Sequence, residues 1–182
     1  MPAVFDMAQA PSDVARLPEA LAALGVHFIL VPHLPKTYLD GAALAVGGRP
    51  VIALTLRYDR LDNLWFTFAH EAAHVARGDA AVLDDRPDRT DRAKDPTERA
   101  ADTAASAWLI NASAYRAFRE ATADRPTRPQ IEAFAQRLGR HPSIVVGRLQ
   151  HDDVISWNQH RWAHVSVRSW LAPWIDQVPP AA

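Results

Sequence analysis

Apolar and polar positions in the first part of the chain predict a helix followed by a strand. Apolar side chains recur at helical spacing in residues 14–24, where Pro18 marks the beginning of the helix and Gly25 can cap its end. Residues 26–31 form a short apolar run that stops at a proline, as a strand does. The preceding residues 1–13 show no such period, so we expect a loose arm there.

Two further apolar runs predict a β-hairpin. Residues 41–46 and 50–56 flank Gly47-Gly48. Paired glycines between apolar runs are typical of a tight turn between antiparallel strands, although Arg49 leaves the register open. A small sheet among helices makes the expected fold class α+β.

A buried helix should follow the hairpin. Residues 64–76 are almost wholly apolar, and a helix that is apolar all round is a buried one. Asp62 or Asn63 can cap its beginning, and Gly78 can end it. The polar residues inside this helix therefore need partners, because burying an unpaired polar group is costly.

The next segment is polar. Residues 79–97 are rich in Asp, Arg and Pro and predict a surface loop. Asp95 or Thr97 can cap the following helix, which contains Glu98 and runs to about Ile110.

The C-terminal third predicts short helices. Residues 113–121 form one helix, and residues 124–129 break it. Residues 131–138 and 142–150 then have the spacing of a helix-turn-helix. A DNA-recognition helix needs several polar or basic side chains, but Arg148 is the only basic residue of the second helix. A helical cap packed on the core is therefore favoured over DNA reading.

These patterns suggest a core and a cap. We expect residues 1–124 to form the core and residues 125–182 the cap, unless residues 1–182 are one domain. Four tryptophans at positions 157, 162, 170 and 174 predict more core packing, and residues 178–182 a frayed end.

Composition narrows the cellular setting. The 182 residues are 48% hydrophobic and 23% charged, with a net charge of −1, so electrostatics do not favour nucleic acid as a partner. The absence of cysteine excludes disulfides and thiolate metal sites. No apolar run reaches membrane-spanning length, and the first residues do not resemble a signal peptide. We therefore expect a cytoplasmic protein that is not bound to a membrane.

His70-Glu71-Ala72-Ala73-His74 is an H-E-x-x-H motif inside the buried helix. Residues four apart share one face of a helix, so His70 and His74 can offer two nitrogens to one zinc ion. Glu71 is placed to hold and deprotonate a zinc-bound water, which makes it the candidate catalytic base.

A catalytic zinc usually has a third protein ligand. The metzincin pattern fails because Arg77 and Ala80 stand where glycine and the third histidine would be, and no cysteine exists. Glu98 on the next helix can be the third ligand, and Asp102, one turn later, can accept the outer N–H of a ligating histidine. In isolation both acids would be solvated surface residues. We predict one zinc per chain.

Peptide hydrolysis also needs a donor that stabilises the tetrahedral intermediate. Tyr115, His141 and Arg148 are candidates for this role, and their spacing in the sequence does not choose among them.

The chain resembles the ImmA/IrrE family of zinc metallopeptidases. The resemblance covers about residues 14–170. It is carried by the H-E-x-x-H motif, by Glu98-Arg99-Ala100-Ala101-Asp102, by Trp108-Leu109-Ile110, and by residues 56–63 and 141–150.

The resemblance implies a gluzincin-like zincin core with a small β-sheet packed on the motif helix. It implies that His70, His74 and Glu98 are zinc ligands and that Glu71 is the base. It also implies that Asp102 accepts the outer N–H of a ligating histidine. Many relatives have an N-terminal DNA-binding domain, for which the arm here is too short, so a partner would supply DNA targeting. The family also often has Glu where Ala100 stands and Phe where Ala104 stands.

Two functions remain open at this stage. The first is an intracellular zinc endopeptidase that cleaves one regulatory protein, of the repressor or antitoxin type, such as a helix-turn-helix transcription regulator. An extended substrate could add to the sheet edge. The second is a catalytically quiet zinc-containing module that sequesters a regulator or toxin. Direct DNA binding by residues 131–150 would show as a steep salt dependence of affinity.

Overall fold

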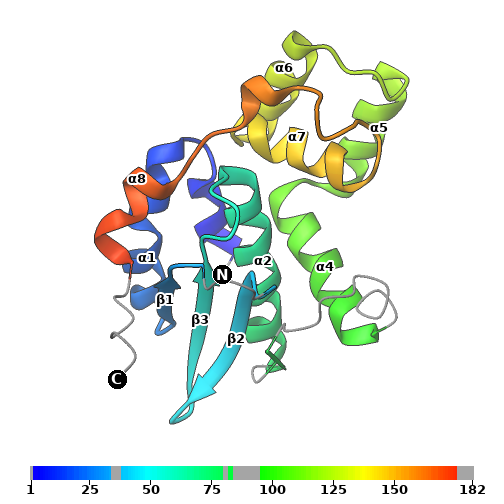
Figure 1. Cartoon of the computed structure of the whole chain (residues 1–182). Helices are drawn as coiled ribbons and strands as arrows, with labels where there is room; N and C mark the ends of the chain where they lie inside the picture. Colours follow the sequence, from blue (N-terminus) through cyan, green and yellow to red (C-terminus); the bar gives the residue numbers. More distant parts are fainter. Residues whose placement is uncertain (1, 34–37, 80–81, 84–94, 176–182) are drawn as a thin grey trace.

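The computed structural model describes residues 2–33, 38–79, 82–83 and 95–175, and it is an α+β structure (Figure 1). In chain order the strands are β1 (His27–Val31), β2 (Gly41–Val46), β3 (Arg49–Thr55) and β4 (Val82–Leu83). The α-helices are α1 (Leu17–Ala23), α2 (Leu61–Arg77), α4 (Pro96–Leu109), α5 (Ala112–Thr122), α6 (Arg128–Leu138), α7 (Pro142–His151) and α8 (Arg168–Leu171). Short 3-10 helices are η1 (Pro2–Met7), η2 (Pro11–Arg16), η3 (Arg161–Ala163) and η4 (Ala172–Trp174).

The sheet has the strand order β1-β3-β2-β4. Strands β1 and β3 are parallel, whereas β2 is antiparallel to both β3 and β4. The predicted hairpin is confirmed, with Val46 opposite Arg49 across a turn whose glycines have φ angles of +57° and +77°. Glycine adopts these angles without the strain that a side chain would bring.

Strand β4 corrects part of the predicted loop at residues 79–97. Val82 and Leu83 pair with Ala43 and Ala42 of β2, so this stretch includes a short strand. The prediction for residues 80–81 and 84–94 lies outside the described residues.

Helix α2 lies against the sheet, and the apolar core forms around it (Figure 1). The fully buried Trp65 and Phe68 of α2 meet Phe5 of η1, with the Phe5 and Phe68 rings 5.3 Å apart. Phe5 also stacks on Trp108 of α4. The expectation of a loose arm is therefore wrong for this segment, because burial of an aromatic side chain ties it down.

The two central helices begin in different ways. Residue Arg60 occupies the N-cap of α2 without a side-chain cap, so the predicted capping by Asp62 or Asn63 is wrong. Asp62 is instead buried and accepts hydrogen bonds from the Arg60 guanidinium. Helix α4 has the predicted cap, in which the Asp95 carboxylate accepts from the Thr97 N–H, and Gly78 ends α2 as predicted, with φ of +78°.

Helix α7 is buried against α2. Its residues 143–147 are all buried, and a Cβ added at Gly147 would lie 2.5 Å from the nearer Asp62 carboxylate oxygen. Close approach of two helices needs such a small residue. Arg140 also donates to the main-chain carbonyls of Trp108 and Leu109, so hydrogen bonds cross the predicted boundary near residue 124. The division into two domains stays a prediction.

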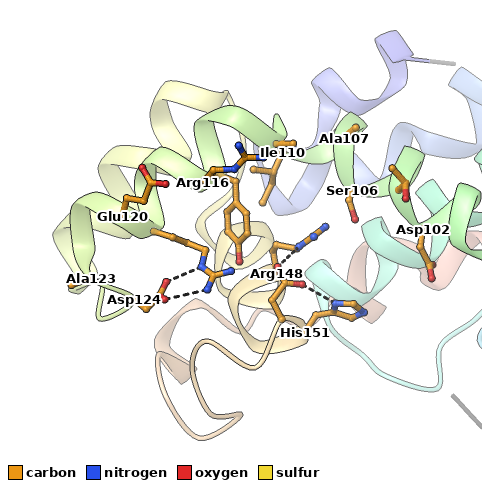
Figure 2. A pocket seen from close by; sticks show the side chains of 15 residues that line it. Asp102, Ser106, Ala107, Ile110, Arg116, Glu120, Ala123, Asp124, Arg148 and His151 are labelled. Carbon is orange, nitrogen blue, oxygen red and sulfur yellow. Dashed lines mark hydrogen bonds and ion pairs between the residues drawn. The ribbon is translucent and has the colours of Figure 1, made fainter. Parts of the chain in front are cut away.

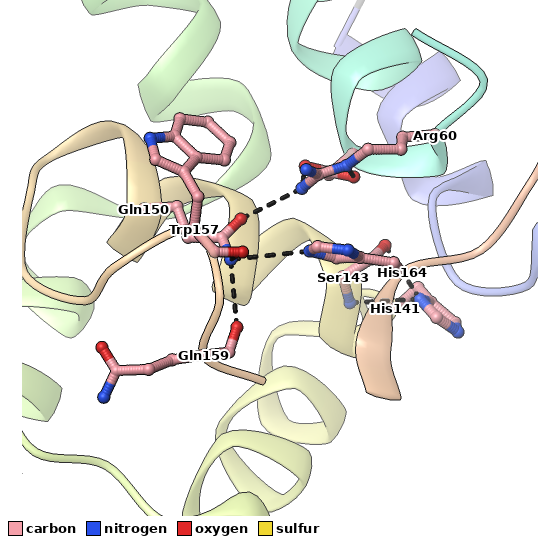
Figure 3. A network of polar contacts seen from close by, with 8 residues as sticks. Arg60, His141, Ser143, Gln150, Trp157, Gln159 and His164 are labelled. Carbon is pink, nitrogen blue, oxygen red and sulfur yellow. Dashed lines mark hydrogen bonds and ion pairs between the residues drawn. The ribbon is translucent and has the colours of Figure 1, made fainter. Parts of the chain in front are cut away.

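A polar network holds the chain after α7 to the beginning of α2 (Figure 3). The buried Gln150 accepts from Arg60 and donates to the carbonyl of Gln159. Asp59, just before α2, accepts from the N–H groups of Val167 and Arg168 at the start of α8. The C-terminal segment is thus fastened by hydrogen bonds as well as by apolar contacts.

The tryptophans of that segment differ from expectation. The predicted core packing is wrong for Trp157 and Trp174, which are 52% and 38% exposed, while Trp162 and Trp170 are half-buried against the core. The expected frayed end at residues 178–182 lies outside the described residues. Among the described helices, none combines the length and apolar character needed to cross a membrane.

Candidate metal centre

The motif histidines and Glu98 converge between α2 and α4. His70 and His74 lie on one face of α2, four residues apart, and Glu98 lies in the first turn of α4. All three side chains are buried, and one ligand atom from each lies within 4.8 Å of the others. These three predicted ligands are therefore brought together.

The spacing of the donor atoms suits a small metal ion. The two Nε2 atoms are 3.0 Å apart, the Glu98 carboxylate lies 3.2 Å from His70 Nε2, and it lies 3.5 Å from His74 Nε2. Ligands about 2.0–2.1 Å from a tetrahedral zinc are separated by about 3.3 Å, so these distances match a tetrahedral face. Two imidazoles and a carboxylate are also a donor set that zinc accepts.

Carboxylates lie behind both histidines. Asp102 Oδ1 is 2.8 Å from His70 Nδ1, the contact predicted from the spacing of Glu98 and Asp102. This places Nδ1–H toward Asp102 and leaves Nε2 for a metal. Half of the Asp102 side chain remains exposed.

Asp79 is a site residue that the sequence reasoning missed. Its Oδ2 lies 4.0 Å from His74 Nδ1 and accepts a 2.7 Å hydrogen bond from Arg77 Nε. The left-handed Gly78 turns the chain back, so that the Asp79 N–H donates to the His74 carbonyl. An acid directly after the glycine that ends a motif helix was the available signal.

Glu71 follows His70 directly in α2, and its side chain contacts the beginning of β2. It is 1% exposed. A Cβ added at Gly41 would lie 2.8 Å from Glu71 Oε1 and 2.8 Å from Thr67 Cγ2. The space that holds the Glu71 carboxylate therefore exists because residue 41 has no side chain.

Two neighbouring cavities lie beside the candidate metal centre and share four lining residues. A cavity of about 600 Å³ reaches His70 and Asp102. A second cavity of about 680 Å³ lies between α4, α5 and α7 (Figure 2). Both are lined by Asp102, Ser106, Arg148 and His151, so together they form one groove along the C-terminal half of α4.

Two of the three candidate stabilising residues, Arg148 and Tyr115, line the cavity between α4, α5 and α7. Arg148 lines both cavities, and Figure 2 shows it extending from α7 toward Ser106 and Asp102 of α4. Tyr115 lies beneath it, with the Arg148 guanidinium 5.4 Å from the ring centroid. Burial and the neighbouring Asp152 carboxylate raise the Tyr115 pKa, so its hydroxyl stays protonated.

His141 has a structural contact instead. It occupies the N-cap of α7, where its Nδ1 accepts from the Ser143 N–H. Burial lowers its pKa, and the Asp62 carboxylate opposes that shift. His141 is not among the residues that line either cavity.

Comparisons of the chain with models of protein families, with curated proteins and with solved structures find no match. The function must therefore be inferred from the side chains themselves, and their arrangement agrees with a metal centre.

We expect the wild-type protein to bind one zinc ion, and we expect replacement of His70, His74 or Glu98 by Ala to remove most of that affinity. Asp102→Asn should weaken zinc binding by about 10–100-fold, because the neutral amide is a poorer acceptor for the His70 N–H. Competition with a chromophoric chelator measures both. The control is His27→Ala, which changes an exposed histidine. Unchanged affinity in all three ligand variants would exclude this site.

Gly41→Ala should displace the Glu71 carboxylate and leave the zinc affinity unchanged, because the new methyl group meets Glu71 and Thr67 but none of the three ligands. Overpacking should lower the free energy of unfolding by about 1–3 kcal/mol. Adding Thr67→Ser removes one of the two clashes and should restore part of that loss. A crystal structure and chemical denaturation check these outcomes; a Glu71 carboxylate in its original position would contradict the first.

Proposed function

We propose that this protein is a zinc-dependent endopeptidase with a gluzincin-like core, akin to the ImmA/IrrE family. The proposal rests on the buried triangle of His70, His74 and Glu98 donor atoms, with Glu71 next to His70 on the same helix. Its substrate would be a regulatory protein, such as a helix-turn-helix transcription regulator, in the cytoplasm.

The ligand set supports a catalytic zinc over a structural one. Structural zinc sites have four protein ligands, whereas catalytic sites keep one position open. In the described residues the metal-binding group has three members, and the chain has no cysteine to add. When bound there, zinc would polarise the scissile carbonyl and make a water acidic enough to attack it.

Glu71 would act as the general base. A general base must take a proton from the attacking water and return it to the leaving amine. Glu71 follows a ligand directly in the sequence, and its carboxylate is held in a fixed space beside Gly41. Packing of this kind keeps a catalytic group in one orientation, which reduces the entropy lost on reaching the transition state.

Arg148 is the candidate that would stabilise the tetrahedral oxyanion. It lines the cavity that contains His70, and its Nε donates a 2.8 Å hydrogen bond to Asp152. Burial alone would raise the Asp152 pKa, but hydrogen bonds from His151 and Arg148 lower it to about 2. Asp152 is therefore ionised at neutral pH and, with the Tyr115 ring, holds the guanidinium at the cavity wall.

Glu71→Gln should abolish proteolysis while the fold and zinc affinity are retained, because glutamine cannot accept the proton of the water. Mass spectrometry of new protein N-termini would compare native-host cells that express wild type or Glu71→Gln. We expect new termini in the wild type only, concentrated in one regulatory protein.

Glu19→Gln, which changes an exposed glutamate of α1, is the matched control and should behave as wild type. Identical termini in wild-type and Glu71→Gln cells, with both proteins folded and zinc-loaded, would contradict the proposal. A protein that sequesters its regulator would then be the better explanation.

Arg148→Ala should lower kcat by about 10²–10³-fold on a peptide spanning the identified cut site, with little change in zinc affinity. Arg148→Lys should keep part of the activity, since it retains the charge but loses the planar geometry. Tyr115→Phe keeps the ring beneath Arg148 and should stay near wild type. A loss of zinc affinity equal to the loss of kcat would instead assign Arg148 a structural role.

A further inference from the structure

The cavity that reaches His70 has an exposed aromatic rim. Large hydrophobic side chains are exposed at six described positions, and three of them line this cavity. These three are Tyr38, Tyr58 and Trp157, which are 60%, 47% and 52% exposed. Exposed apolar groups that gather at a cavity mark a binding site more strongly than scattered ones do.

Two arginines lie against the aromatic rings of this rim. The Arg57 guanidinium lies 5.0 Å from the ring centroids of both Tyr38 and Tyr58. The Arg60 guanidinium lies 5.4 Å from the Trp157 centroid, and Figure 3 shows these two side chains beside each other. Cation–π contacts of this kind fix the orientation of the rings before a ligand arrives.

The positive charges at the rim are already compensated. Arg57 pairs with Asp40 at 3.4 Å, and Arg60 pairs with Asp62 at 2.6 Å. Arg60 also donates to Gln150, so its position is fixed by two partners. An acidic substrate would have to break such pairs, whereas an apolar side chain would only need to cover exposed rings.

We propose that this rim binds a large aromatic side chain of the polypeptide substrate, close to the bond that is cut. This inference rests on the proposed peptidase function, because it places the scissile bond near His70 in the same cavity. Stacked and edge-to-face aromatic pairs add attraction beyond the area that they bury, which favours Phe, Tyr or Trp over aliphatic residues. The rim therefore selects uncharged, aromatic-containing segments over acidic ones. A further cation is disfavoured because Arg57 and Arg60 already lie over the rings that would attract it.

The test uses the zinc-loaded Glu71→Gln protein, which binds without turnover. The probes are short, uncharged, fluorescein-labelled peptides that differ only in one central residue, which is Phe, Leu, Gly, Glu or Lys. Fluorescence anisotropy should give the lowest Kd for Phe and a Kd about tenfold or more higher for Gly, Glu and Lys. Trp157→Ala should remove most of the difference between Phe and Gly, and Trp157→Phe should keep part of it.

Trp174→Ala is the matched control, because it removes an exposed tryptophan that does not line the cavity. Equal affinities for the Phe and Gly peptides, the same preference in Trp157→Ala, or no binding at millimolar peptide would each overturn the inference. Glu71-dependent cleavage could still be found in those cases. Conversely, a Phe preference in the absence of any cleavage would keep the aromatic site and reject the peptidase function.

Discussion

Burial of ionisable groups between α2 and α4 is the constraint on which the rest of the structure depends. His70, His74 and Glu98 are each 5% exposed or less. Charged or unpaired groups lose several kcal/mol of hydration when they are buried, so they must hold one another or a metal ion. The donor spacing near 3 Å and the Asp102 carboxylate against His70 Nδ1 contribute to meeting that requirement.

Alanines make this arrangement sterically possible. Ala73 on α2 and Ala101 and Ala105 on α4 are buried, and α2 and α4 are in contact. Small side chains allow two helix backbones to approach, which lets the short Glu98 side chain reach both histidines. Larger residues at these positions would push the two helices apart.

The C-terminal helices contribute to the site as well as to the core. Gly147 allows α7 to press on α2 at Asp62, and the next residue, Arg148, enters the groove from that contact. Trp157 reaches the rim because Gln150 bonds the following chain to α7 and to Arg60. These helices therefore do more than cover apolar surface, since they place an arginine and a tryptophan in the cavity that reaches His70.

The sequence predicted those features that depend only on residues close together in the chain. The hairpin followed from its glycine pair, and the shared face of His70 and His74 followed from the helical period. The contacts of Glu98 and Asp102 with His70 also followed from their spacing, since both acids lie on one helix. Phe5 and Trp157 could not be placed in this way, because their surroundings come from segments that are distant in the chain.

The arrangement around α2 also bears on how a substrate would be recognised. Adjacent residues of a helix point about 100° apart, so His70 faces α4 while Glu71 faces β2. Strand β4 already occupies the pairing positions of Ala42 and Ala43 on β2, and a strand added to the sheet there would meet β4 first. Main-chain pairing with β2 is therefore restricted next to Glu71. Contacts between substrate side chains and the cavity that contains His70 avoid that restriction, which favours recognition through the rim over recognition through the sheet edge.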